Sequence, residues 1–293
     1  MTEQRTRDST ARGLEQADCR PSGHASRWII RFNAQQRLQH ILLAGSIMVL
    51  ILTGFPIKYA FEPWAPVVTR MLGGFDVMFS IHLVAATLMI LSGVYHLFWI
   101  AFNFRRLDWA MLPSLKDLRD AGDHFAYLLG WRQAPPDFGR YTYLEKFEYL
   151  AVFYGIAVMG LSGFFLSFPE VGAALAPRWV LDVLRVAHSN EALVCFISIA
   201  VGHSFWVHFH PSVFPSSTVW YKGTISEHHL AEEHPAEYRR WLQSQGLDPS
   251  QAPHPAHEPT RYQRSRLFIT VELAVYGAVA VWLYATFVPM LFQ

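Results

Sequence analysis

Four histidines in two long apolar segments are the side chains of this chain whose spacing is best suited to chemistry. One segment contains His82 and His96, and the other contains His188 and His203. An imidazole in hydrocarbon is costly unless its nitrogens bind a partner. The members of each pair are separated by 14 and 15 residues, which is roughly 21–22 Å along a helix. Since a bilayer core is about 30 Å thick, the sequence predicts two metal centres at two depths.

Five windows of the chain are long and apolar enough to span a bilayer. They run over His40–Tyr59, Phe79–Phe102, Tyr149–Phe168, Leu181–Phe209 and Phe268–Phe292. The fold class that we predict is therefore all-α. It is an integral membrane bundle in which four transmembrane helices form the core and a fifth is added at the C-terminus.

The polar segments complete the predicted domain organisation. We expect residues 1–26 to form a disordered cytoplasmic tail and residues 27–209 to form the four-helix core. Residues 210–267 form a cytoplasmic loop segment, and residues 268–293 form the fifth transmembrane helix. Within the loop segment, EHHLAEEHPAEYRRWL predicts a short charged helix pair with a solvated surface.

Charge and cysteine content exclude several classes of protein. The net charge is +1, so bulk charge gives no reason to expect a nucleic-acid partner. Cys19 and Cys195 provide no disulfide framework. The chain has no Cys-x-x-Cys-His motif, which excludes covalent c-type haem, and it has too few cysteines for an iron–sulfur cluster.

The distribution of basic residues predicts the orientation of the bundle. Of the 24 Lys and Arg residues, 20 lie in residues 1–39, 103–147 and 210–267. Cytoplasmic segments carry this excess of Lys and Arg. We therefore expect a protein of the bacterial inner (cytoplasmic) membrane, with a cytoplasmic N-terminus and a C-terminus on the periplasmic side.

This orientation places the histidines at matched depths. His82 and His188 both lie near the outer face, whereas His96 and His203 both lie near the inner face. Iron in b-type haem is a metal that proteins hold with histidine alone. Two parallel helices with histidines at two common depths therefore predict two b-type haems, each with two axial imidazoles.

The inner site has one histidine more than a single iron needs. His40 opens the first span at the inner boundary and is level with His96 and His203. Depth does not distinguish between His40 and His96 as the partner of His203. A third haem held by His96 and His208 is an alternative that uses the extra histidine.

Each ligating imidazole also needs a partner for its second nitrogen. For His188, the nearest candidates in sequence are Ser189, Asn190 and Glu191. Glycines such as Gly54 and Gly163 would allow a flat macrocycle to approach the backbone, although small residues are common at any helix interface in a membrane.

Several motifs resemble the membrane cytochrome b subunits of formate dehydrogenases, nickel–iron hydrogenases and thiosulfate reductases. The resemblance is closest to the cytochrome b modules found beside multihaem c-type cytochromes. It covers about residues 27–242 and is carried by RFNAQQRLQHILLAGSIMVLILTGFPIKY, PSLKDLRDAG, FGRYTYLEKFEY, HSNEALVCFISIAVGHSFWVHFHPSVFP and YKGTISEHHLAEEHPAEYRRW. The fifth span, His96 and the long segment 210–267 depart from the hydrogenase type.

The resemblance implies a ligand set and a task. The outer haem would use His82 and His188, and the inner haem would use His203 with His40, or with His96 as the alternative. The chain would be an electron-transfer subunit of an oxidoreductase complex. It would link the quinone pool to a periplasmic multihaem c-type cytochrome or to an iron–sulfur or catalytic subunit.

A quinone site needs a titratable group near a haem edge, and the resemblance favours the inner side. The charged and polar residues that cluster there at the starts of spans one and three are Asn33, Arg37, Glu145, Lys146 and Glu148.

Two other functions would use the same apolar helices. In a proton-relaying transporter, the buried histidines would carry protons, and the protein would be colourless. A membrane anchor would recruit a partner through its cytoplasmic loops, and its function would survive the substitution His188→Ala.

Overall fold

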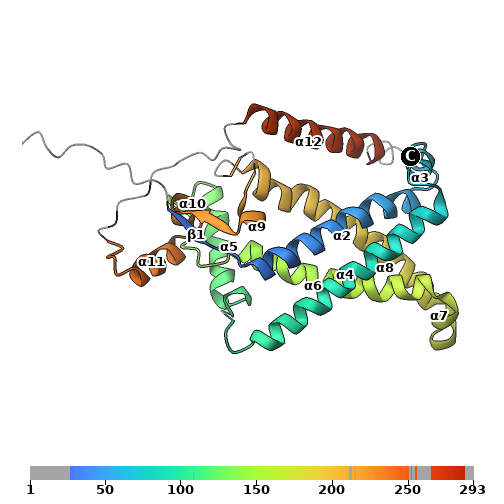
Figure 1. The fold of residues 1–293 in the computed structure, drawn as a ribbon, viewed down its shortest axis with the longest axis horizontal. Helices are drawn as coiled ribbons and strands as arrows, with labels where there is room; N and C mark the ends of the chain where they lie inside the picture. The colour runs from blue at the N-terminus through green and yellow to red at the C-terminus, as the bar shows by residue number, and fades with distance from the viewer. Residues whose placement is uncertain are drawn as a thin grey trace, which may run out of the picture.

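In the computed structural model, the described residues form five long helices, whose arrangement is shown in Figure 1. The structure describes residues 27–107, 109–210, 213, 214, 216–250, 252, 255 and 265–287. The predicted disordered tail, residues 1–26, lies outside the described residues, as does the end of the predicted fifth span.

The five long helices are each long and apolar enough to cross a membrane, which confirms the all-α membrane fold. Successive helices run in opposite directions along one axis (Figure 1). They are α2 (Ala34–Lys58), α4 (Phe75–Asn103), α6 (Tyr143–Ser167), α8 (Arg178–Ile197, continued as a π-helix to Phe209) and α12 (Arg266–Phe287).

Helices α2 and α6 begin six residues before the apolar windows that predicted them. Asn33 caps α2 and Thr142 caps α6, and each forms a reciprocal capping box with the residue three positions later. A capping box satisfies backbone N–H groups that have no partner inside the helix. The polar first turns are therefore helical although their hydropathy does not indicate it.

The fourth span is not a regular α-helix. Its last part, Ser198–His203 and Phe205–Phe209, is π-helical, so hydrogen bonds join residues five apart instead of four. The angular positions of side chains in this segment therefore do not follow the ~100° per residue of an α-helix.

The bundle has two different ends. The outer end, which is the predicted periplasmic side, carries the short helices α3 (Ala65–Met71) and α7 (Pro169–Leu175). The inner end carries α5 (Leu115–Leu128), a short 3₁₀ turn (Trp109–Met111) and the segments β1 and α9 to α11 described next. The described parts of the three segments rich in Lys and Arg therefore lie at one end, as the charge distribution predicts (Figure 1).

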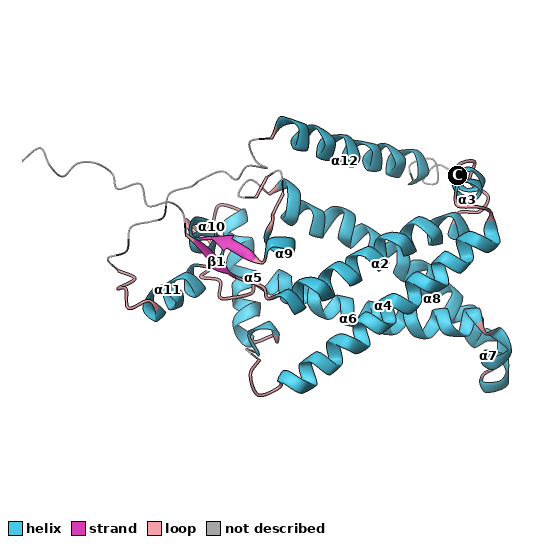
Figure 2. Ribbon diagram, in the orientation of Figure 1, coloured by secondary structure: helices cyan, strands magenta, loops and turns pink. Residues whose placement is uncertain are grey.

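The inner cap is a small folded unit on that end. It consists of β1 (Trp28–Ile30), β2 (Thr224–Ser226), α9 (Val219–Lys222), α10 (Glu227–Glu233) and α11 (Pro235–Ser244). The strands pair antiparallel, with Ile29 opposite Ile225, and form the magenta arrows of Figure 2.

The inner cap has its own hydrophobic core, which contains Ile225, Leu230, Tyr238 and Leu242. The predicted helix pair is confirmed by α10 and α11, but the expectation of a solvated surface was wrong. His234 is 5% exposed, and its burial and the Arg31 guanidinium lower its pKa to about 3. Burial and the hydrogen bond to Glu227 raise the pKa of Tyr238 to about 12.

Trp282 makes one of the contacts between helix α12 and the core. The Trp282 ring stacks on Phe55 of α2 at 5.6 Å between centroids and contacts Phe196 of α8 edge-on at 5.7 Å. The fifth helix is thus joined to the four-helix core on the side formed by α2 and α8.

Candidate functional site

The histidines lie in two helix pairs that are built alike. Helix α2 packs along α4, and α6 packs along α8. In each pair the second helix carries two histidines, which are hydrogen-bonded to polar side chains of the first helix. The first helices share the tetrapeptide pattern Leu-Thr/Ser-Gly-Phe, at Leu52–Phe55 in α2 and at Leu161–Phe164 in α6.

His82 of α4 is held by a buried hydroxyl of α2. Its Nδ1 lies 2.8 Å from Oγ1 of Thr53, which is fully buried. The Thr53 hydroxyl donates its single proton to the Val49 carbonyl at 2.8 Å, so it accepts the hydrogen bond from His82 Nδ1–H. This fixes the tautomer and leaves the lone pair on Nε2, the nitrogen that can bind a metal.

His188 of α8 has the same arrangement with α6. Its Nδ1 lies 2.9 Å from Oγ of Ser162, and Ser162 donates to the Val158 carbonyl at 2.5 Å. The Met159 carbonyl also accepts from the ring. The partner predicted from sequence was wrong, because Ser189 and Asn190 instead bind Nζ of Lys58 at 2.6 and 3.4 Å.

A glycine follows each of these hydroxyl residues and makes room for the imidazole. A Cβ atom on Gly54 would lie 3.1 Å from Cε1 of His82, and one on Gly163 would lie 3.1 Å from Cε1 of His188. Both distances are shorter than ordinary van der Waals contact. These two glycines therefore leave the space that the two imidazole rings occupy.

At the inner end, the structure brings His40 and His203 together. Their ring centroids are 6.4 Å apart, and Trp220 of α9 lies on the other side of His40 at 6.1 Å. Nδ1 of His203 is 3.1 Å from a carboxylate oxygen of Glu148 on α6. The carboxylate accepts the Nδ1 proton, so the Nε2 lone pair of His203 is left for a metal.

His96, at the same end, has protein partners on both ring nitrogens. Nδ1 is bonded to the side-chain oxygen of Gln39, and Nε2 is 2.9 Å from the Tyr149 hydroxyl. A ring with both nitrogens occupied has no lone pair to offer a metal. The hydrogen bonds of His96 therefore favour His40 as the metal ligand. Depth along the helices did not distinguish the two.

An internal duplication relates these two inner arrangements. When the sequence is aligned with itself at an offset of 109 positions, Gln39, His40, Thr53 and Gly54 align with Glu148, Tyr149, Ser162 and Gly163. The pair His40 and His203 thus corresponds to the pair Tyr149 and His96. In the first pair, the two imidazole rings lie 6.4 Å apart. In the second pair, the tyrosine hydroxyl is hydrogen-bonded to the imidazole.

The π-helix fits this duplication. His82 and His96 are 14 residues apart, whereas His188 and His203 are 15 apart. The π-helical segment Ser198–His203 lies between the last two. Since a π-helical turn accommodates one extra residue in a helix, His203 keeps a place equivalent to that of His96.

The comparison with protein families agrees with this arrangement. The model of the prokaryotic cytochrome b561 family matches residues 31–221, which include both helix pairs. The chain belongs to the prokaryotic cytochrome b561 family. A comparison with curated proteins gave no significant match.

This cytochrome b561-family protein is a membrane protein of the b-haem electron-transfer type. The match confirms the predicted cytochrome b superfamily and the multi-pass bacterial membrane location. Helix α12 and most of the inner cap follow the matched residues.

The inner histidines of the cytochrome b561-family protein fit one haem iron. A bond between a metal and an imidazole nitrogen is about 2 Å long, so two imidazoles on one metal place their ring centroids about 6 Å apart. The rings of His40 and His203 are 6.4 Å apart. The outer histidines fit as well, because both have Nδ1 bound and Nε2 available.

Two basic side chains near these sites fit the negative propionates of haem. Nε of Arg37, one turn before His40, is buried and has no hydrogen-bond partner among the described residues. At the outer end, Lys58 lies against the turn of α8 that follows His188.

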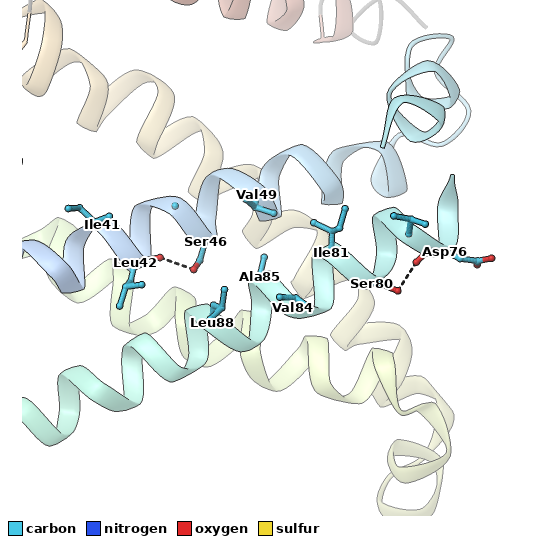
Figure 3. A pocket seen from close by; sticks show the side chains of 12 residues that line it. Ile41, Leu42, Ser46, Val49, Asp76, Ser80, Ile81, Val84, Ala85 and Leu88 are labelled. Carbon is cyan, nitrogen blue, oxygen red and sulfur yellow. Dashed lines mark hydrogen bonds between the residues drawn. The ribbon is translucent and has the colours of Figure 1, made fainter. Parts of the chain in front are cut away.

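A further cavity of this cytochrome b561-family protein lies between α2 and α4 and has a volume of about 770 Å³. Figure 3 shows that its polar hydroxyls are already used, since Ser46 donates to the Leu42 carbonyl and Ser80 to the Asp76 carbonyl. The rest of its wall is mainly aliphatic, including Ile41, Val49, Ile81, Val84 and Leu88.

Proposed function

We propose that this protein is a dihaem cytochrome b that carries electrons across the bacterial inner membrane. It would connect the quinone pool with a partner redox protein as a subunit of a respiratory oxidoreductase. The observation that carries the proposal is the facing pair His40 and His203 at 6.4 Å, within the family of b-haem membrane proteins.

The outer haem is assigned to His82 and His188, and the inner haem to His40 and His203. Supporting the outer assignment, both imidazoles are fixed in the tautomer with a free Nε2 by matching hydroxyls, Thr53 and Ser162. Supporting the inner assignment over the alternative with His96, both nitrogens of His96 are bonded to protein groups.

The haem iron supplies the one-electron redox chemistry, and the chain determines where and at what potential it occurs. Thr53 and Ser162 accept the Nδ1 protons of the outer imidazoles, whereas the carboxylate of Glu148 accepts that of His203. A carboxylate partner makes the ligating imidazole more basic than a hydroxyl does. We therefore expect the inner haem to have the lower midpoint potential.

Alanine substitutions with haem counting test the ligand assignment. Purified wild-type protein should contain two haems, and His188→Ala and His40→Ala should each contain one. The matched substitution is His96→Ala, which lies at the same inner depth as His40→Ala but should retain both haems. A variant His96→Ala with one haem, together with a variant His40→Ala with two, would contradict the inner assignment.

The same material distinguishes the alternative functions. A transporter or a membrane anchor would be purified colourless, and His188→Ala would not affect its function. A dihaem protein with quinone chemistry should show the absorption changes of reduced b-type haem when a short-chain quinol is added without oxygen. A periplasmic multihaem cytochrome, or an iron–sulfur or catalytic subunit, is the partner class that we expect to co-purify from native membranes.

A further inference from the structure

A second group of titratable side chains lies where α12 meets the π-helical end of α8. His208 of α8 is hydrogen-bonded through Nδ1 to Oε1 of Glu272 on α12. Their side chains are 27% and 10% exposed. Glu272 is six residues into α12, or about 9 Å along the helix. This carboxylate is therefore within the inner half of the predicted span, where an ionisable group is expensive and usually functional.

The second oxygen of this carboxylate is unsatisfied. Oε2 of Glu272 is buried and has no hydrogen-bond partner among the described residues. A pair that only fastened α12 to α8 would be expected to satisfy both oxygens or to be replaced by apolar contacts. A buried acceptor with no donor instead indicates that a hydroxyl of a bound molecule belongs there.

Aromatic rings pack beside His208, the partner of this carboxylate. Tyr276 lies one turn after Glu272 on the same face of α12. Its ring is 5.3 Å from that of His208 and 4.4 Å from that of Phe209, between centroids. Its hydroxyl contacts Ser204, the residue next to His203. Flat aromatic walls and a few polar groups are typical of a pocket for a planar organic ring.

The π-helix brings this group towards the inner histidine site. In an α-helix, residues five apart point about 140° away from each other. In π-helical backbone, hydrogen bonds join residues five apart, as from Ser204 N to Ile199 O, so such residues approach one face. His208 is five residues after His203 and is therefore directed towards the same side of the helix.

We propose that Glu272, His208 and Tyr276 form the head-group site for a quinone or its hydroquinone. This inference rests on the proposed function, because the haems exchange the electrons. Oxidation of a hydroquinone breaks two O–H bonds and releases two protons and two electrons. Oε2 of Glu272 takes one proton, Nε2 of His208 takes the other, and two ferric b-type haems take one electron each. Quinone reduction is the reverse.

Competing places in the molecule fit a quinone ring less well. The groove between α2 and α4 has hydroxyls that are already bonded to backbone carbonyls (Figure 3). The inner residues suggested by sequence also have structural partners. Asn33 and Glu145 close capping boxes, Lys146 binds Asp117, Arg37 binds the carbonyls of Tyr221 and Lys222, and Glu148 binds His203.

The test measures hydroquinone binding to the reduced, haem-loaded protein, which has no ferric haem left to accept electrons. Anaerobic titration calorimetry with decylubiquinol and with menadiol gives the affinity, and haem content is measured on every sample. We expect Glu272→Gln to weaken binding at least about tenfold, because a charge-assisted hydrogen bond is lost. Tyr276→Phe should also weaken binding, whereas Tyr284→Phe, on an exposed part of the same helix, should bind as the wild type does.

A photoreactive azidoquinone locates the site independently of any variant. The cross-link should map to the peptide containing Glu272 or to that containing His208. Labelling of the groove between α2 and α4, or wild-type affinity in Glu272→Gln, would refute the proposed quinone site. Glu272 and His208 would then be only a structural ion pair. If Glu272→Gln loses haem or misfolds, the affinity of Tyr276→Phe and the position of the cross-link test the site instead. Wild-type protein without haem would refute the proposed function itself, and haem without quinone binding would refute its quinone part.

Discussion

Arg31 and Arg140 exchange hydrogen bonds across the inner end of the bundle. Nη2 of Arg31 donates to the carbonyl of Arg140, and Nη2 of Arg140 donates to the carbonyl of Arg31 at 2.7 Å. Each residue stands three positions before the first residue of its helix, α2 or α6. The two helices therefore begin at a reciprocal contact, as expected for duplicated halves related by an approximate twofold axis.

Glu237 of the inner cap neutralises this pair. It binds both Arg31 and Arg140, and the Arg31 side chain is only 3% exposed. Removing the carboxylate would take away the counter-charge that the two guanidinium groups share and would leave buried Arg31 only the more distant Glu145, at 3.9 Å. We expect Glu237→Ala to destabilise the inner cap by about 3–5 kcal/mol.

Protease protection of the peptide bonds between β2 and α11 measures this effect. The matched control is Glu232→Ala, since Glu232 is 44% exposed and interacts only within α10 with His228; that variant should change stability by less than about 1 kcal/mol. Equal protection in the two variants would show that Glu237 is not required to hold the cap.

Gly54→Ala tests the space left for the outer imidazole. The new Cβ would be 3.1 Å from Cε1 of His82, and a ring bonded to iron cannot yield. Overpacking of this kind costs about 1–3 kcal/mol, so we expect reduced occupancy of the outer haem. In Gly45→Ala, on the same helix, the Cβ would meet nothing within 4 Å, and haem content should be unchanged. Full haem occupancy in both variants would contradict this role of Gly54.

Thr53→Val tests whether the hydroxyl fixes the ligand tautomer. The substitution keeps the shape of the side chain but leaves Nδ1–H of His82 without its acceptor. We expect the outer site to bind haem about 10–100-fold more weakly. The midpoint potential of the outer haem should also shift in a redox titration. Thr87→Val is the matched control, because the Thr87 hydroxyl bonds only the Leu83 carbonyl of its own helix. A potential unchanged by Thr53→Val would argue against the hydrogen bond as a determinant.

The sequence was sufficient to predict the helices, because they follow from hydropathy, whereas the assignment of His82 and His188 to one haem remains a prediction. The duplication was not predicted. Its equivalent positions exchange Gln39 for Glu148, His40 for Tyr149 and Thr53 for Ser162, which preserves hydrogen-bonding capacity but not residue identity. The repeated Leu-Thr/Ser-Gly-Phe pattern is the signal that could have revealed it.

Other features depend on contacts that no local pattern contains. The partner of His188 is on another helix, 26 residues earlier in the chain, so a search within its own turn could not find it. Glu272 is a charged residue in an apolar window of the sequence, and its pairing with His208 depends on how α12 docks against α8. The inner cap was predicted to be solvated because its charged residues outnumber the few that form its core.

Acidification should loosen the inner cap through His234. Its pKa in the folded chain is about 3, because the ring is buried beside Arg31, and the pKa of an unfolded histidine is about 6.5. Between these two pH values, the unfolded chain binds a proton at His234 and the folded chain does not. The stabilisation is therefore complete above pH ~6.5 and decreases as the pH falls towards ~3. At pH ~5 the decrease is about 2 kcal/mol.

Hydrogen exchange of the β1 and β2 amides, corrected for the intrinsic effect of pH on exchange, measures this loss. His234→Asn retains a donor for the Gly139 carbonyl, which accepts from His234 Nδ1 at 2.8 Å, but it does not titrate. Arg31, Arg140 and Glu237 remain in both proteins, so the difference between wild type and variant isolates the imidazole. Protection should decrease more steeply from pH ~7 to ~5 in the wild type, and parallel curves would show that protonation of His234 does not control the cap.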